Sequence, residues 1–139
     1  KTTEAGPTVV NAPFVDNSNK WAGGGLLATP EDVTRFVLGL LQGDLLPDRR
    51  VETLFAPEAE IEGEPYHYGL GWRANPSDEQ GRHRVWHTGG ARGGSGVVLF
   101  FPEREVVVTT LANASSVPHF DLAERMTTIL MSGGPSSGR

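Results

Sequence analysis

The stretch WHTGGARGGSGVVLFFPEREVVVTTLAN, residues 86–113, decides the fold. Its two apolar runs, GVVLFF at 96–101 and VVVTTL at 106–111, have the length and residue types of strands in a sheet covered on both faces. The residues between them, 102–105, are Pro-Glu-Arg-Glu, a short charged turn, so the two strands are expected to form an antiparallel hairpin. A further strand is expected just upstream, at 83–88.

Helices are expected on both sides of these strands. At 29–41, Thr29 is a good N-cap, Pro30 suits the first helical position, and Asp32 can complete a capping box. The apolar residues that follow recur at helical spacing, namely Val33, Phe36, Val37, Leu40 and Leu41. A shorter helix is expected at 47–56 and a closing helix at 118–131.

The aromatic segment YHYGLGWR, residues 66–73, is interrupted by glycines. It predicts one strand that contains a bulge or a close approach of the backbone to a neighbour. The three tryptophans, Trp21, Trp72 and Trp86, are expected to pack in the core or at its rim.

These elements predict an α+β fold in which an antiparallel sheet is flanked by helices. We expect an irregular segment at 1–28, a helical segment at 29–60, a C-terminal sheet plus closing helix at 61–131 and a disordered tail at 132–139. The closing helix is expected to cover one sheet face, and no segment is an obvious cover for the other. Together with the long irregular start, this indicates that a further part of the protein packs here.

Composition excludes several classes of function. The 139 residues carry 12 Lys plus Arg against 17 Asp plus Glu, a net charge of −5, so no nucleic acid or anionic membrane partner is expected. The chain has no Cys, which excludes disulfides and thiol catalysis. Its apolar runs are far shorter than the roughly 20 residues that a bilayer span requires, so no membrane span is expected.

Neither metal nor cofactor is expected. His83 and His87 are four residues apart, but on a strand four residues extend over about 13 Å, so the two cannot share one ion. The glycine-rich stretch at 89–96 matches neither the P-loop nor the dinucleotide-binding fingerprint. Its spacing alone leaves two alternatives open, a turn between strands or a functional site.

The functional alternative begins from the strand end at 87–90, which displays an imidazole, a hydroxyl and then a backbone without side chains. Exposed peptide groups at such a strand suit an extended ligand that adds along the edge, or the stabilisation of an oxyanion during acyl transfer. The plainer interpretation is a half-exposed histidine and a sheet threonine that only contribute to the fold.

Three motifs in order resemble the serine beta-lactamase and penicillin-binding-protein-like hydrolases. Residues 86–113 resemble the third-motif strand and its hairpin, where a Lys-Thr-Gly or His-Thr-Gly strand borders the active site. NKWAGGGLLATPEDVTRF at 19–36 resembles the upstream glycine turn and helix, and YGLGW at 68–72 resembles the strand between them. The likeness extends over about 19–130 and is nearest the class C-related branch, with its esterases, D-aminopeptidases and mitochondrial beta-lactamase-like proteins. It implies a partial beta-lactamase/transpeptidase-like fold.

The resemblance implies roles for four residues, and the place of Arg92 in the following turn adds a fifth candidate. His87 takes the place of the motif lysine and would favour an anionic or carbonyl group of the substrate; being largely uncharged at neutral pH, an imidazole favours esterase or peptidase chemistry. Thr88 would offer its hydroxyl to the ligand, Gly89 would leave room for it, and Gly90 would supply one backbone N–H of the oxyanion hole. Arg92 would reach a substrate carboxylate, or is simply a solvated loop residue.

Two motifs of these hydrolases are absent from the sequence. No Ser-x-x-Lys nucleophile motif occurs, since Ser18 is followed by a lysine two residues on, and neither Tyr66 nor Tyr68 has an asparagine two residues later. We therefore expect the C-terminal portion of a hydrolase that cleaves amide or ester bonds through an acyl-enzyme, inert alone. Its partners would be the missing N-terminal part and a small-molecule or peptide acyl substrate.

Two alternatives stay open. One is a non-catalytic module of the same fold, a pseudoenzyme that binds a peptide or partner chain along its glycine-rich strand. The other is that the chain is one product of a proteolytic cut whose partner stays bound. The sequence favours no cellular compartment.

Overall fold

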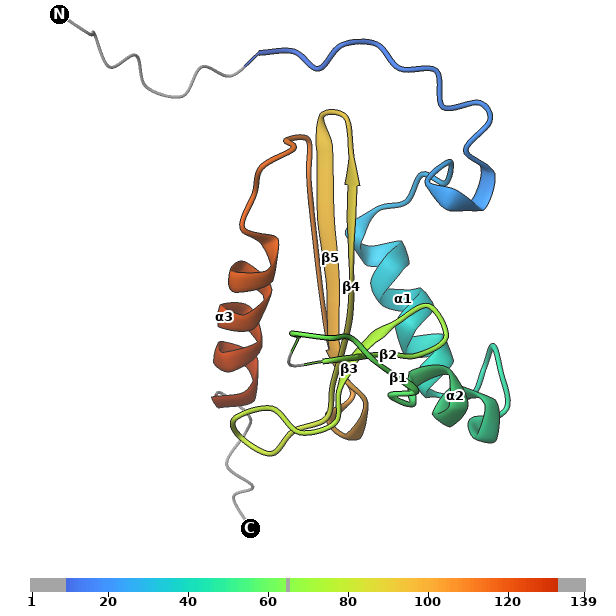
Figure 1. Ribbon diagram of the computed structural model, residues 1–139, viewed down its shortest axis with the longest axis vertical. Coiled ribbons are helices and arrows are strands. Elements are labelled where there is room, and N and C mark those ends of the chain that lie inside the picture. The colour runs from blue at the N-terminus through green and yellow to red at the C-terminus, as the bar shows by residue number, and fades with distance from the viewer. Residues whose placement is uncertain (1–9, 65, 133–139) are drawn as a thin grey trace, which may run out of the picture.

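Six strands form one antiparallel sheet in the computed structural model of the chain, which describes residues 10–64 and 66–132 (Figure 1). The strands lie in sequence order: β1 (Ala59–Glu60), β2 (His67–Tyr68), β3 (Arg73–Asn75), β4 (Arg84–Ala91), β5 (Gly94–Phe101) and β6 (Val106–Ala112). The helices are α1 (Pro30–Leu41), α2 (Asp48–Phe55) and α3 (His119–Ser132), with short 3₁₀ turns at Trp21–Gly23 and Pro102–Arg104. The α+β class with an antiparallel sheet flanked by helices is therefore confirmed.

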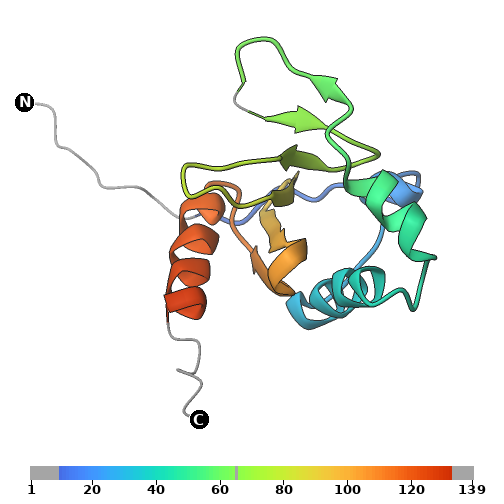
Figure 2. The same cartoon turned by 90° about the horizontal axis from the view of Figure 1, so that it is seen from below.

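Helices of the chain itself cover both faces of the sheet (Figure 2). On what we call the front face, α1 and α2 bury a cluster that includes Val37, Phe55 and Phe100. On the back face, α3 buries a second cluster that includes Leu99 and Ala123. Because successive β5 side chains point to opposite faces, each apolar residue of 97–101 joins one cluster or the other. The cover of the front face, for which the sequence offered no obvious segment, is supplied by α1 and α2.

Local signals determine where α1 begins. The side chain of Thr29 accepts a hydrogen bond from the backbone N–H of Asp32 (3.1 Å), and the Asp32 carboxylate accepts one from the backbone N–H of Thr29 (3.0 Å). This reciprocal capping box satisfies two backbone donors at the helix start. The hydrogen bonds from Thr29 also lower the pKa of Asp32, because they favour the charged carboxylate.

The segment 66–73 differs from the expected single strand. It forms two short strands, β2 and β3, joined by a turn in which Gly69 N–H donates to the carbonyl of Trp72 (2.7 Å). The close backbone approach is confirmed: a Cβ at Gly69 would lie 2.5 Å from the carbonyl oxygen of Ala56, just after α2. The tight turn and this contact together explain why glycine interrupts the aromatic segment.

Two of the three tryptophans pack as expected. Trp72 lies edge-on against the rings of Phe55 and Phe100, and Trp86 is 4% exposed between Tyr66 and Phe120. Trp21 was expected to pack and does not, because 81% of its surface is exposed.

The chain ends of the described region only partly test the expectations for them. Residues 10–20 contain no helix or strand, and residues 1–9 of the expected irregular segment lie outside the described residues. Of the expected tail at 132–139, Ser132 is the last residue of α3 and the others lie outside the described residues. The pairing of β1 with β2 was not expected. No helix within 10–64 or 66–132 has the length and apolarity to cross a membrane.

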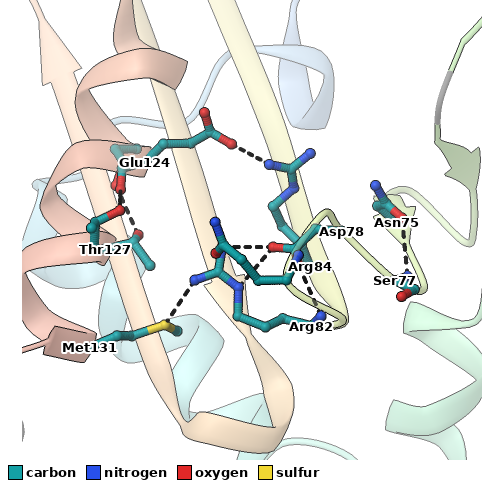
Figure 3. A network of polar contacts seen from close by, with 11 residues as sticks. Asn75, Ser77, Asp78, Arg82, Arg84, Glu124, Thr127 and Met131 are labelled. Carbon is teal, nitrogen blue, oxygen red and sulfur yellow. Dashed lines mark hydrogen bonds and ion pairs between the residues drawn. The ribbon is translucent and has the colours of Figure 1, made fainter.

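A polar network ties the β3–β4 loop to α3 (Figure 3). The Asp78 carboxylate accepts hydrogen bonds from the side chain and the backbone N–H of Arg82, and Arg84 forms an ion pair with Glu124. Burial alone would raise the pKa of Asp78, but the hydrogen bonds from Arg82 outweigh it and lower the pKa. The network fastens α3 to the back face at the end of the sheet away from the β4–β5 turn (Figure 1).

Candidate active site

Strand β4 has two halves with different neighbours. Its lower half, residues 84–86, lies between β3 and β5, whereas its upper half, residues 87–91, pairs with β5 alone (Figure 1). One edge of the upper half is therefore unpaired among the described residues. This edge contains four of the five residues for which the sequence predicted a role in the site.

The register shows which peptide groups face the unpaired edge. Ala91 and Gly94 close a two-residue turn, so they form a hydrogen-bonded pair. Hydrogen-bonded and non-hydrogen-bonded pairs alternate along an antiparallel ladder, which makes Gly90–Ser95 and Thr88–Val97 non-hydrogen-bonded pairs. The N–H and C=O groups of Thr88 and Gly90 consequently point away from β5, toward the unpaired edge.

The space around this backbone is open. A Cβ placed at Gly89 or Gly90 would meet no atom within 4 Å. On the front face the same strand borders a groove of about 450 Å³, whose lining includes His87, Val33 of α1 and the exposed side chains of Leu26 and Leu111. The faces of the strand at Gly89 and Gly90 are thus not covered by neighbouring atoms.

His87 lies in the first position of the upper half and is partly buried. Its Nε2 is 2.7 Å from the hydroxyl of Tyr68 on β2, and the two rings meet edge-on with centroids 6.1 Å apart. The hydroxyl holds the imidazole in one orientation beside the groove. His87 is therefore part of a His–Tyr pair at the strand end.

Thr88 projects from the opposite face of β4 and contacts an arginine. Its hydroxyl accepts a hydrogen bond of 2.7 Å from Arg73 Nη1. The Arg73 guanidinium lies 5.7 Å from the ring centre of Tyr66 and 5.9 Å from that of Tyr68, within cation–π range. Its Nε has no hydrogen-bond partner, and no carboxylate of the described residues forms an ion pair with it. A positive charge thus lies beside Thr88.

Arg92, the fifth predicted residue, is placed differently. It occupies the two-residue turn between β4 and β5, is exposed and does not line the groove. The structure brings His87, Thr88, Gly89 and Gly90 together along one edge and leaves Arg92 at the tip of the hairpin.

Sequence reasoning missed Tyr68 and Arg73 as members of this site. Both come from the aromatic segment that was interpreted as one continuous strand, in which they would lie far apart. The turn after Gly69 folds that segment back, so that Tyr68 pairs with Arg73 and Arg73 pairs with Trp86. The signal was the pair of glycines at 69 and 71, which fits a reversal better than a strand.

His83 lies outside the site, in the loop that precedes β4. Burial lowers its pKa, and the nearby charge of Glu103 opposes the shift. Its Nε2 is buried without a hydrogen-bond partner. Across the described ranges, no three His, Cys, Asp or Glu residues gather in a way that could hold a metal ion.

Comparison with known proteins gives consistent matches. The family described as "Beta-lactamase" matches residues 1–130. The serine beta-lactamase-like protein LACTB, mitochondrial, of Bos taurus is 34% identical over 149 residues, which cover 78% of this chain and 26% of that protein. The chain thus spans about a quarter of the length of this protein and of its human and mouse counterparts.

Solved structures show the same fold. A penicillin-binding protein from Bacillus halodurans matches with a TM-score of 0.64 and 23% identity over 73% of this chain and 30% of that one. The octameric penicillin-binding protein homologue from Pyrococcus abyssi matches with a TM-score of 0.67 and 20% identity over 77% of this chain and 25% of that one. Since the family match covers residues 1–130 of 139, the chain belongs to the beta-lactamase family, the serine hydrolases and penicillin-binding-protein-like enzymes that its motifs resemble.

Proposed function

We propose that this chain is the C-terminal portion of a serine hydrolase that cleaves amide or ester bonds through an acyl-enzyme. The upper half of β4 forms one wall of the acyl site in this proposal. The observation that carries it is the unpaired edge, at which the N–H of Gly90 has no partner strand within 10–64 and 66–132 and lies beside His87 and Thr88. Membership of a serine hydrolase family supports the reaction class.

Gly90 has the central role at this wall. Attack on the substrate carbonyl places a negative charge on its oxygen, and a fixed backbone N–H stabilises that charge without having to reorganise. The second donor would be the backbone N–H of the nucleophilic serine, which belongs to a part of the hydrolase outside this sequence. The substrate would extend along the edge and pair with the peptide groups of Thr88 and Gly90, as an added strand does.

His87 and Tyr68 act at the start of this wall. As the serine oxygen bonds to the carbonyl carbon, its proton passes to a base and then to the departing amine or alcohol, whose bond to carbon breaks. Water repeats the sequence in the second half-reaction and releases the acid. We place the His87 imidazole within reach of the reacting carbonyl or leaving group, with Tyr68 fixing its orientation. The base is not assigned to this chain, which contains no Ser-x-x-Lys motif.

A second candidate uses the same edge without chemistry. A module that binds a peptide by strand addition needs an unpaired edge and open backbone, both of which the upper half of β4 provides. The absence of a nucleophile motif from this sequence favours this alternative over catalysis by the chain alone.

A fluorophosphonate, which reacts with activated serines, tests the proposal directly. We expect the complete protein to be labelled on a serine upstream of residue 1 and to hydrolyse a chromogenic ester, while the 139-residue chain remains unlabelled. Heat-denatured complete protein is the control for non-specific labelling. A complete protein that neither reacts with the phosphonate nor hydrolyses any of a panel of esters and amides contradicts the proposal and selects the binding module.

A further inference from the structure

We propose that His119 is a positioning residue for this site: through Ser95 it fixes the hairpin that carries Gly90. The inference rests on the proposed function and extends it to a residue on the opposite face of the sheet. His119 is the first residue of α3 and is 6% exposed. It contacts neither the groove nor the unpaired edge of β4, so it would act through the strands that it holds.

His119 joins two neighbouring strands on the back face. Its Nε2 lies 2.9 Å from the hydroxyl of Ser95 on β5, and its Nδ1 lies 2.6 Å from the hydroxyl of Thr110 on β6. Both ring nitrogens therefore have partners. A buried polar group with every hydrogen bond made fixes its surroundings in one arrangement, because any displacement leaves it unsatisfied.

The direction of each hydrogen bond follows from counting protons. The Ser95 hydroxyl donates its single proton to the carbonyl of Ala114, so toward His119 it can only accept. Nε2 must then carry a proton, and in the neutral imidazole Nδ1 accepts the proton of the Thr110 hydroxyl. A neutral imidazole protonated on Nε2 satisfies all of these groups.

The same proton count separates this pair from a catalytic serine and its base. A nucleophilic serine donates its proton to the histidine, whereas here the histidine donates to Ser95. His119 is also buried and is not among the residues that line the groove. The arrangement is therefore structural support and not a second active centre.

The hairpin needs this support because it is nearly devoid of side chains. Five of the eight residues at 89–96 are glycines, which offer nothing to pack against a neighbour. Ser95 lies directly opposite Gly90, and this pair is not hydrogen-bonded in the ladder. A second tether acts at the turn, where Gly93 N–H donates to the hydroxyl of Ser115 (3.0 Å). Polar contacts to the 114–119 segment thus hold the position of Gly90 where apolar packing cannot.

Variants of the complete hydrolase test the role. His119→Phe keeps a ring of similar size and removes both hydrogen bonds, whereas His119→Gln keeps an N–H that can donate to Ser95. Since small misplacement of a catalytic group lowers turnover by up to about 100-fold, we expect His119→Phe to lower kcat about 10- to 100-fold with KM within about threefold. We expect His119→Gln to recover most of the loss.

Thr127→Val is the matched control, because Thr127 is also buried on α3 and its hydroxyl bonds only within the helix, to the carbonyl of Ala123. We expect it to leave kcat unchanged. If Thr127→Val lowers kcat as much as His119→Phe does, general loosening of α3 explains the effect and the positioning role is wrong. If His119→Phe does not fold, Ser95→Ala removes a single hydroxyl and is judged by the same criteria.

Amide hydrogen exchange gives a readout that does not depend on catalysis. Ala91 N–H is bonded to β5, so its exchange rate reports how firmly the hairpin is held. We expect exchange at the ladder-bonded amides of Gly89, Ala91 and Gly96 to rise at least about tenfold in His119→Phe and not in Thr127→Val. Unchanged exchange and unchanged kcat would overturn the inference while leaving the proposed function intact. A complete protein without hydrolase activity would instead remove the proposed function, and exchange would still decide whether His119 holds the hairpin.

Discussion

Replacing Gly90 by proline removes the one backbone N–H that the proposed mechanism requires. Proline lacks the N–H and fixes φ near −65°, whereas alanine keeps the N–H and adds only a methyl group. The pair of variants therefore isolates the donor from the bulk of the side chain. Both are made in the complete protein.

The structure indicates that neither substitution removes a bond of the fold. Gly90 is in a non-hydrogen-bonded pair with Ser95, so its N–H makes no ladder bond that proline would break. A Cβ at this position meets nothing within 4 Å. Loss of one oxyanion donor, by contrast, lowers turnover by about 10²–10³-fold, equivalent to about 2.7–4 kcal/mol in the acylation barrier. The effect on rate should thus far exceed the effect on stability.

The rate of inactivation by a fluorophosphonate measures acylation, and thermal unfolding measures the fold. We expect Gly90→Pro to slow inactivation at least about 100-fold at nearly unchanged melting temperature, with Gly90→Ala retaining much of the wild-type rate. Gly89→Pro is the structural control, because Gly89 and Gly96 form a hydrogen-bonded pair and proline there breaks a ladder bond. Wild-type inactivation of Gly90→Pro would refute the oxyanion role and leave Gly90 as a strand residue only.

Three further predictions follow from the site and the fold. His87→Ala should lower kcat on a chromogenic ester at least about tenfold at an unchanged melting temperature. His67→Ala, on β2, is the control. A lower melting temperature at unchanged kcat would instead make His87 a core residue. Burial lowers the pKa of His83 despite the opposing charge of Glu103, so protonation favours the unfolded chain, and the free energy of unfolding should fall as pH drops below 6.5. His83→Gln should flatten that slope in urea titrations, and an equally steep slope in the variant contradicts the assignment. Light scattering should show that the 139-residue chain alone self-associates. The reasons are that α3 exposes apolar side chains and that one edge of β6 has no partner strand among the described residues. A monodisperse monomer with strong amide exchange protection at 97–101 would contradict this prediction.

Local sequence signals were sufficient for the elements whose cause is local. The capping box of Thr29 and Asp32 lies within one turn of helix, and α1 begins where it predicts. The two apolar runs predicted strands β5 and β6, and the charged residues between them predicted the turn that joins the strands. The amphipathic faces of α1 and α2 predicted that these helices are packed, but an apolar face does not specify which surface it covers. Their place on the front of the sheet was consequently missed.

Contacts between distant residues lay beyond this reasoning. His87 reaches Tyr68 only because the chain reverses after Gly69, and Arg73 reaches Thr88 for the same reason. A four-residue turn changes which residues pair in every strand that follows, and amino-acid composition alone does not specify where such a turn occurs. Sequence reasoning assigned no role to His119, because its partners on β5 and β6 become neighbours only when α3 folds onto the sheet.

The wall formed by Gly89 and Gly90 has a consequence for how a hydrolase of the proposed kind would acquire new substrates. Every residue except proline offers the same peptide N–H and C=O, so substitution along this stretch of β4 cannot change the hydrogen bonds of the wall, and an added side chain would occupy the open space along which the substrate extends. Variation in substrate preference must therefore accumulate in the side chains that surround the wall, such as Leu26, Val33 and Leu111. Directed evolution that randomises those three positions and leaves 89–90 untouched should broaden the range of accepted acyl groups while preserving the reaction.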